Sequence, residues 1–192
     1  MLGSSRATRK MVRPNAPLHS EPSKEPKNPS NMMKRTVTDL RIQSGVLKTW
    51  PSGKIRMSGG KLLDIRCGIV ARRSSVARVW LESRFRSQPP DRCVLHYHSP
   101  FLSRYLSLDL VLAGPQTHLS TIRGACAMLD EIARLRGAVA IFAHVSTTRI
   151  SDRLLQRLGW QRHLQGESGR HWIKRFYNGY PDHDLQRYVT QE

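Results

Sequence analysis

Apolar positions repeat most clearly between Leu106 and Trp160, and their spacing changes from one run to the next. Leu106–Ala113 has leucines at alternating positions, which predicts a strand, and a Gly-Pro turn signal follows it. Helical spacing then continues to Gly137 and predicts an amphipathic helix. Its apolar positions are Ile122, Ala125, Cys126, Leu129, Ile132, Ala133 and either Leu135 or Arg136.

A second strand and a second helix follow at once. Ala138–Val145 is small and β-branched enough to be a buried strand, and Ile150–Leu158 has a helical pattern that ends at Gly159. Strand, helix, strand and helix with tight connections form a βαβα unit. The two strands are therefore expected to be parallel neighbours joined by a right-handed crossover.

Shorter alternating runs precede this unit. Residues 36–61 predict one or two short strands or a loosely packed lead-in. Alternation from Leu63 to Ile69 predicts a strand, and Ser74–Arg86 is favoured as a helix that stops before a Pro-Pro pair. Arg92–His98 then predicts a strand that pairs antiparallel with Tyr105–Ala113.

After the unit, Arg170–Tyr177 alternates again and predicts a closing strand, and the last ten residues predict a short helix or a frayed end. Residues 1–35 contain five prolines among serine, asparagine, lysine and arginine, with almost nothing that could bury apolar surface. They predict a disordered basic tail, and residues 36–192 predict a single domain.

The charge adds a class of partner to this picture. Lys and Arg number 32 and Asp and Glu 14, for a net charge of +18, of which residues 1–35 carry +6 and residues 36–192 carry +12. Such a surface attracts polyanions: nucleic acid, phosphorylated cofactors or acidic lipids. The alternative is that the arginine content reflects genomic base composition, and the charge alone leaves both open.

The three cysteines, Cys67, Cys93 and Cys126, form no CxxC pair, which indicates a reducing compartment without structural disulfides. No apolar run approaches the roughly 18 residues of a membrane span. The basic N-terminus lacks the apolar segment of a secretory signal. The expected location is the cytoplasm.

The loop Gly114–Ser120 connects the first core strand to the long helix. Helix N-termini leave N–H groups unpaired and carry partial positive charge, so they suit phosphate or pyrophosphate. Thr117, Ser120 and Thr121 are candidate caps, and Arg123 lies one turn further on. A plain capped helix without a ligand is the other interpretation.

Together these features resemble the acetyl-CoA-binding half of the Gcn5-related N-acetyltransferase (GNAT) superfamily. The resemblance covers about 92–181 and rests on the strand, the loop, a helix ending in Arg136-Gly137, a strand, a second helix ending in Leu158-Gly159-Trp160, and the closing RHWIKRFYNGYP. It implies an α/β (α+β) fold with a mixed, centrally splayed sheet flanked by helices. It further implies acetyl-CoA as co-substrate, bound by about 105–177, and direct attack by an unidentified amine.

The resemblance assigns acetyl-CoA contacts to one set of residues. They are Leu112, Ala113, Gln116, Thr117, His118, Leu119, Ser120, Thr121, Arg123 and Ser151. The family's loop usually carries two glycines, which Gln116–Thr121 lacks; an alternative alignment on Arg123–Met128 would shorten the helix. Leu155 stands where the family often has a tyrosine acid, and Thr147 or Thr148 replaces a common asparagine.

Two residues are candidate general bases for the amine. Asp109 lies on the first core strand and His144 lies near the end of the second, where the resemblance places the acyl group. His144 is the better placed of the two. Imidazole also titrates near neutral pH, which suits a general base. A structural histidine, and an aspartate paired with an arginine, are the competing interpretations.

Other histidine and cysteine side chains also have candidate roles. His96 and His98 share a strand face and, with Cys93, are a weak candidate metal site; Cys126 is expected to pack in the core. Two functions remain: an acyl-CoA-dependent N-acyltransferase, or an inactive GNAT-fold module whose basic tail or surface binds nucleic acid or another polyanion.

Overall fold

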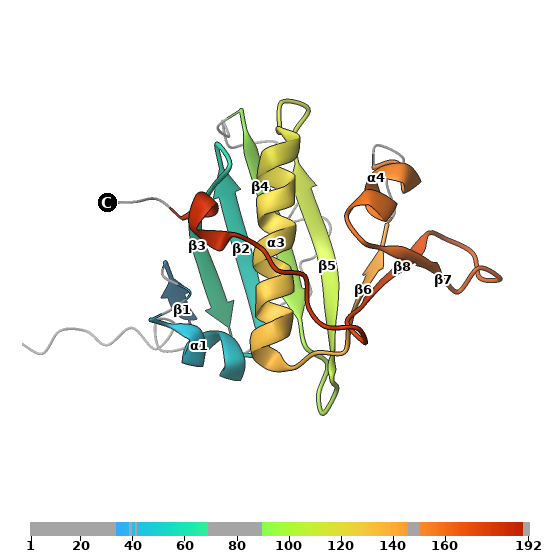
Figure 1. Ribbon diagram of the computed structural model, residues 1–192, viewed down its shortest axis with the longest axis horizontal. Helices are drawn as coiled ribbons and strands as arrows, with labels where there is room; N and C mark the ends of the chain where they lie inside the picture. Colours follow the sequence, from blue (N-terminus) through green and yellow to red (C-terminus); the bar gives the residue numbers. More distant parts are fainter. Residues whose placement is uncertain (1–33, 39, 41, 69–89, 146–149, 190–192) are drawn as a thin grey trace, which may run out of the picture.

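Eight strands of the described residues form one mixed, open sheet, flanked by helices (Figure 1). The computed structural model describes residues 34–38, 40, 42–68, 90–145 and 150–189. The strands follow the order β1-β3-β2-β4-β5-β6-β8-β7 across the sheet. Their bounds are β1 Lys34–Val37, β2 Ser52–Ser58, β3 Lys61–Gly68, β4 Arg92–His98, β5 Tyr105–Ala113, β6 Ala140–His144, β7 Gln161–His163 and β8 His171–Arg175. The helices are α1 Ser44–Thr49, α3 Leu119–Arg136, α4 Asp152–Arg157 and the 3₁₀ helix η2 Leu185–Tyr188.

The βαβα unit is present as the hydrophobic pattern predicts. β5 and β6 are parallel neighbours connected by α3, and β4 pairs antiparallel with β5. α3 ends where Gly137 adopts a left-handed conformation, with φ at 63°, which glycine reaches without a steric penalty. The predicted fold class, a mixed sheet flanked by helices, is confirmed.

Three elements differ from the prediction. α1 lies where only strands or a lead-in were expected, β7 was not foreseen as a separate strand, and β1 begins at Lys34, two residues before the predicted domain start. α1 depends on a distant contact: one guanidinium nitrogen of Arg136 donates to the carbonyl oxygens of Leu47, Lys48 and Trp50 at its C-terminal end. The predicted helix Ser74–Arg86 and residues 1–33 lie outside the described residues.

The two parallel core strands stay paired over only part of their length. β5 has nine residues, but its described pairing with β6 covers Tyr105 to Leu108. The register with β4 also shifts here: His96 faces Leu110 and Tyr97 faces Leu108, so Asp109 is the extra residue of a β-bulge. β5 and β6 then separate, as Figure 1 shows. We call the stretch of β5 from Asp109 to Ala113, together with His144 on β6, the β5–β6 divergence.

The two faces of the sheet differ in chemistry. Residues opposite one another in register point to the same face, and the face against α3 is apolar, with Ile55, Leu95, Tyr97 and Leu106 almost completely buried. The other face mixes polar and apolar side chains, and we call it the histidine face. Its apolar members include Val94, Leu110, Leu112, Phe142 and Ile173. Its polar members include Lys54, Arg56, Asp64, Arg66, His96, His98, Ser107, Asp109, His144, His163 and His171.

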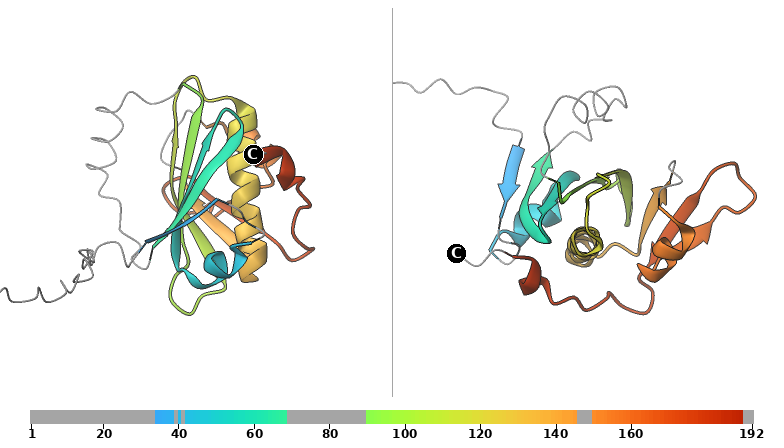
Figure 2. Two further views of the ribbon diagram at one scale, coloured as in Figure 1. Left: turned by 90° about the vertical axis from the view of Figure 1, so that its left-hand side faces the viewer. Right: turned by 90° about the horizontal axis from the view of Figure 1, so that it is seen from above.

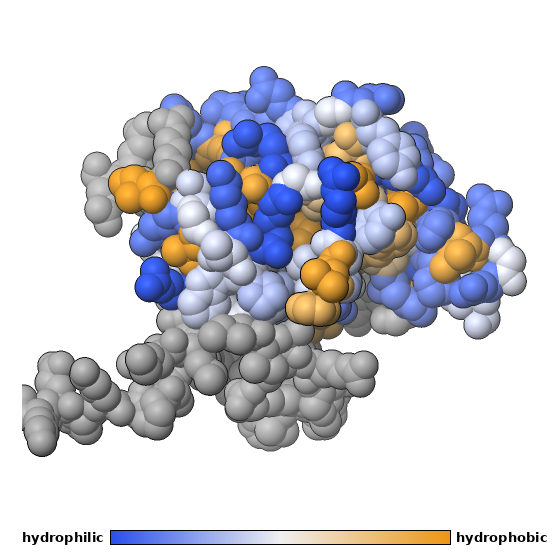
Figure 3. All heavy atoms as spheres, turned by 90° about the horizontal axis from the view of Figure 1, so that it is seen from below, coloured by the Kyte–Doolittle hydropathy of each residue, from blue (hydrophilic) through white to orange (hydrophobic). Residues whose placement is uncertain are grey.

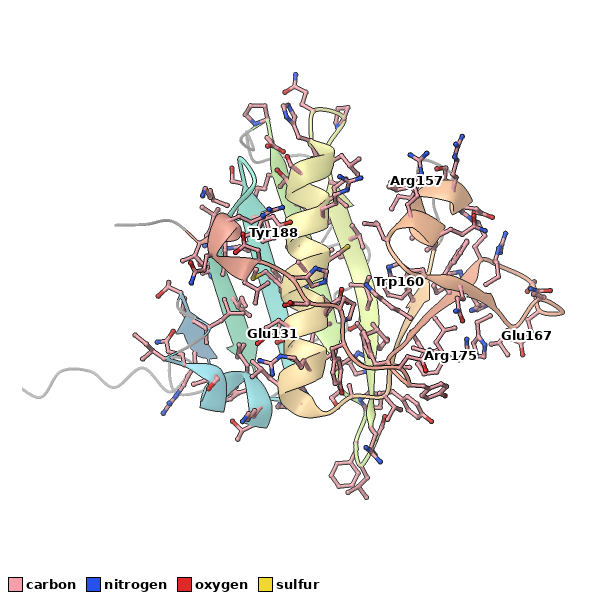
Figure 4. All side chains as sticks on the ribbon, in the orientation of Figure 1. Glu131, Arg157, Trp160, Glu167, Arg175 and Tyr188 are labelled. Carbon is pink, nitrogen blue, oxygen red and sulfur yellow. The ribbon has the colours of Figure 1, made fainter. Side chains whose placement is uncertain are left out.

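The C-terminal segment crosses α3 on the apolar side of the sheet, as both views in Figure 2 show. His183 bonds Asp130 of α3 at 2.8 Å, and Lys61 of β3 donates to the carbonyl of Arg187 at 2.9 Å. Tyr188, labelled in Figure 4, packs against Gly124 of α3 so closely that a Cβ there would lie 2.8 Å from its ring. We call this segment, residues 176–189, the strap. It links β8, from which it continues, to α3 and β3.

Large hydrophobic side chains are also exposed at the turn between β4 and β5. Phe101 and Leu102 are 92% and 91% exposed. In Figure 3, which views the molecule from below, hydrophobic residues form separate patches among hydrophilic ones. Among the described helices, none is long and apolar enough to cross a membrane.

Asp130 makes a second ion pair inside this packing. Lys174 of β8 donates to its carboxylate at 2.6 Å, and both residues are more than 90% buried. Removing one partner of such a pair leaves a charge in a low-dielectric interior, whereas replacing both with apolar groups of similar volume is often neutral. We therefore expect single substitutions in this pair to be destabilising and a double apolar substitution to be tolerated.

We expect Lys174→Met to lower the free energy of unfolding by about 3 kcal/mol, and Lys174→Met/Asp130→Leu to recover most of that loss. Urea denaturation measures both. Arg134→Met is the matched control on α3, because Arg134 and Glu131 form an exposed pair worth less than about 1 kcal/mol. Equal effects from the buried and the exposed substitution would contradict this account.

Candidate functional site

The N-terminus of α3 leaves backbone donors open. His118 is the N-cap residue, with extended φ and ψ of −71° and 148°, and its side chain makes no capping hydrogen bond. The predicted capping residues Thr117, Ser120 and Thr121 are not the N-cap. The N–H groups of Thr121 and Ile122 bond the His118 carbonyl. Those of Leu119 and Ser120 have no partner among the described residues. Two N–H groups therefore point from an exposed helix end, where the dipole favours an anion.

Asp91, immediately before β4, holds this helix end in place. Its carboxylate accepts from the backbone N–H of His118 at 2.9 Å and from the hydroxyl of Thr121 at 2.8 Å. Burial on its own would raise the pKa of Asp91, but these two hydrogen bonds and the charge of His118 outweigh it and hold the pKa below its ordinary value. The sequence pattern gave no sign of this residue, because it lies in a turn outside every periodic run.

The predicted acetyl-CoA contacts divide into two groups in the structure. Thr117 and Thr121 use their hydroxyls internally: Thr117 bonds the Gly114 N–H and the Arg92 carbonyl, and fully buried Thr121 also accepts from the Gly60 N–H. Ser151 caps α4 by accepting from the Leu154 N–H at 3.2 Å. The remaining predicted residues lie at the exposed loop and along the end of β5: Leu112, Ala113, Gln116, His118, Leu119, Ser120 and Arg123.

The two predicted bases lie at the start of the β5–β6 divergence. Leu108 and Ala143 are the last paired residues of β5 and β6, and Asp109 and His144 come directly after them. The structure thus brings the two candidates to adjacent strands at the point of separation, both exposed. It also gives each a partner that the sequence did not predict.

Asp109 bonds a histidine, whereas the competing interpretation of the sequence paired it with an arginine. Nδ1 of His98, on β4, lies 2.7 and 2.8 Å from the two carboxylate oxygens, and the Ser107 hydroxyl donates to the same carboxylate at 2.8 Å. The His98 and Asp109 side chains are 31% and 40% exposed. His98 entered the sequence interpretation only as a metal ligand, and its pairing with Asp109 joins two neighbouring strands.

His144 packs against another histidine. Its ring and that of His171 on β8 are 4.6 Å apart in an edge-to-face arrangement. Gly169 lies over both rings: a Cβ there would be 3.1 Å from Cε1 of His144 and 3.2 Å from Nε2 of His171. The loop before β8 therefore covers one side of His144.

The cysteine thiols and the Tyr180 hydroxyl are buried or bonded within the fold. Burial raises the pKa of the Cys93 and Cys126 thiols to about 12, so neither is a ready nucleophile. The Tyr180 hydroxyl donates to the Ala138 carbonyl at 2.9 Å, and Leu155 is buried in the core. No group of three or more His, Cys, Asp or Glu side chains arranged to hold a metal occurs in the described part of the chain.

Comparisons with known proteins add little to this geometry. No family model matches the sequence, and no curated protein matches it. Among solved structures, the chain is similar to the crystal structure of a nourseothricin acetyltransferase, at 13% identity over 74% of this chain and 98% of that one, with a TM-score of 0.37. A likeness of this size is too weak to assign the function.

We expect Asp91→Ala to lower the free energy of unfolding at pH 7 by about 1 kcal/mol, the usual cost of losing a helix N-terminal acceptor. A carboxylate whose folded-state pKa is lowered stabilises the fold above its unfolded pKa, and this stabilisation disappears as the pH falls through the folded pKa. The difference between variant and wild type should therefore begin to shrink near the ordinary aspartate value of 3.8 and vanish only below the lowered folded-state pKa.

Urea denaturation across the acidic range measures this difference. Exposed Asp182, which lies on the strap, provides the control substitution Asp182→Ala. A deficit for Asp91→Ala that stays constant at acid pH would show that packing, and not the carboxylate charge, stabilises the helix end.

Proposed function

We propose that this protein is an acyl-CoA-dependent N-acyltransferase that transfers an acetyl group from acetyl-CoA to an amine by direct attack. One observation carries the proposal: β5 separates from β6 at Asp109, and a loop of five residues after its end leads to the helix end with two open N–H groups. An extended strand edge followed by an anion site suits a ligand with amide groups at one end and a pyrophosphate at the other.

The N-terminus of α3 offers the hydrogen-bond donors and the positive charge that a pyrophosphate needs. The Leu119 and Ser120 N–H groups would donate to phosphate oxygens, the helix dipole adds partial positive charge, and exposed Arg123 adds a full charge one turn along. Asp91 takes up the His118 N–H and the Thr121 hydroxyl, so it restricts the donors to these two. This explains how a loop without glycines can still offer an anion site: the donors belong to the helix itself.

Along β5, residues 110–113 pair with β4 and lie beyond the last described pair with β6. Their edge toward the β5–β6 divergence would hold the amide-containing arm of the co-substrate by main-chain hydrogen bonds. When bound, acetyl-CoA supplies the activated thioester. Strand N–H groups near the bulge at Asp109 would polarise the acyl carbonyl, and the part of the histidine face next to that bulge, at His98 and Asp109, would receive the amine.

Leu119→Pro tests the anion site. Leu119 is the first helical residue, where proline is tolerated, and the extended His118 already has the conformation that proline requires of its predecessor. The substitution deletes one donor and leaves the helix intact. We expect it to weaken acetyl-CoA binding about tenfold, the loss of one hydrogen bond to a charged group, as measured by calorimetry.

Leu119→Ala is the matched control, because it changes the same side chain and keeps the N–H. Equal weakening by both substitutions would refute the role of the N–H group. For the wild type, acetyl-CoA should raise the thermal midpoint, since a ligand of the native state stabilises it. No rise at millimolar acetyl-CoA would refute the proposed function and leave the polyanion-binding alternative.

A further inference from the structure

The proton acceptor for the amine follows from the hydrogen bonds of Asp109. This carboxylate can only accept hydrogen bonds when ionised, and it takes them from the Ser107 hydroxyl and from Nδ1 of His98. Nδ1 must then carry the proton. In a neutral imidazole the other nitrogen, Nε2, is left with its lone pair. Asp109 thus fixes both the tautomer and the orientation of the His98 ring.

This pair lies at the proposed site of reaction. Asp109 is the first β5 residue beyond the last described pair with β6, so the pair lies where the acyl end of the co-substrate would be. His98 and Asp109 are on the histidine face, opposite α3. Both are partly exposed, so an acceptor can approach from that face without displacing the core.

We propose that His98 is the general base, through Nε2, and that Asp109 is its positioning residue and not the base itself. This inference rests on the proposed function. The nitrogen lone pair of the amine forms the new C–N bond to the acyl carbon, and the C–S bond breaks with its electron pair left on sulfur. The proton lost from nitrogen moves to Nε2 of His98, and the thiolate takes a proton from solvent.

His144 is the weaker alternative on the same geometry. Its ring lies against His171 and under Gly169, and no carboxylate among the described residues orients it. His98, by contrast, has a carboxylate within 2.8 Å on the neighbouring strand. An oriented imidazole with a defined lone pair is the arrangement that proton transfer requires.

The test follows the release of free thiol from acetyl-CoA in the presence of a pool of primary amines: spermidine, an aminoglycoside, a lysine peptide and an arylalkylamine. We expect His98→Ala to lower kcat at least about a hundredfold, within the usual range for a general base. Added imidazole should restore part of the rate. Asp109→Asn should lower kcat at least about tenfold, with KM for acetyl-CoA unchanged. His163→Ala, which alters a histidine at the far edge of the same face, should change nothing.

Acetyl-CoA binding, followed calorimetrically for every variant, separates the two claims. If the wild type does not bind acetyl-CoA, the proposed function fails. If it binds but releases no thiol with the pool, or if His98→Ala keeps full turnover, the inference fails. A loss confined to His144→Ala also overturns it. A loss in His98→Ala that imidazole does not relieve would assign the residue a structural role and overturn it as well.

Discussion

The separation of β5 from β6 after four residue pairs is the constraint on which the rest of the site depends. Two parallel strands joined by a helix normally stay hydrogen-bonded along their length, since unpaired backbone groups are costly when buried. Here the described pairing ends at Leu108, beside the bulge at Asp109 and next to solvent, where water can satisfy the strand. Everything proposed about binding uses the edge that this break leaves available.

The chemistry of the site lies beside the same bulge. Ser107 and Asp109 are two residues apart, so alternation along β5 puts both side chains on the face that carries His98. There the carboxylate of Asp109 accepts from the Ser107 hydroxyl and from Nδ1 of His98. The bulge leaves Asp109 without an opposite residue on β4, at the point where β5 and β6 separate.

The sequence predicts the main elements of the core, but it does not predict the short elements or the side-chain contacts of the site. The period of the run from Ile122 to Ala133 identifies α3, because a long amphipathic pattern has one structural solution. α1 and β7 have six and three residues, too few for a period to emerge, and α1 rests on a contact from Arg136. The pairing of His98 with Asp109 joins side chains of two strands, and no pattern along either strand marks it.

The strap has a mechanical consequence. It leaves β8, bonds Asp130 on α3 through His183, and meets β3 through Lys61, so it bridges strands on opposite sides of the β5–β6 divergence. A sheet that comes apart at its middle would otherwise hinge about the few remaining pairs between β5 and β6. The bonds from the strap to α3 and β3 oppose such hinging. We therefore expect the spacing between the two arms of the sheet to change little when a ligand binds.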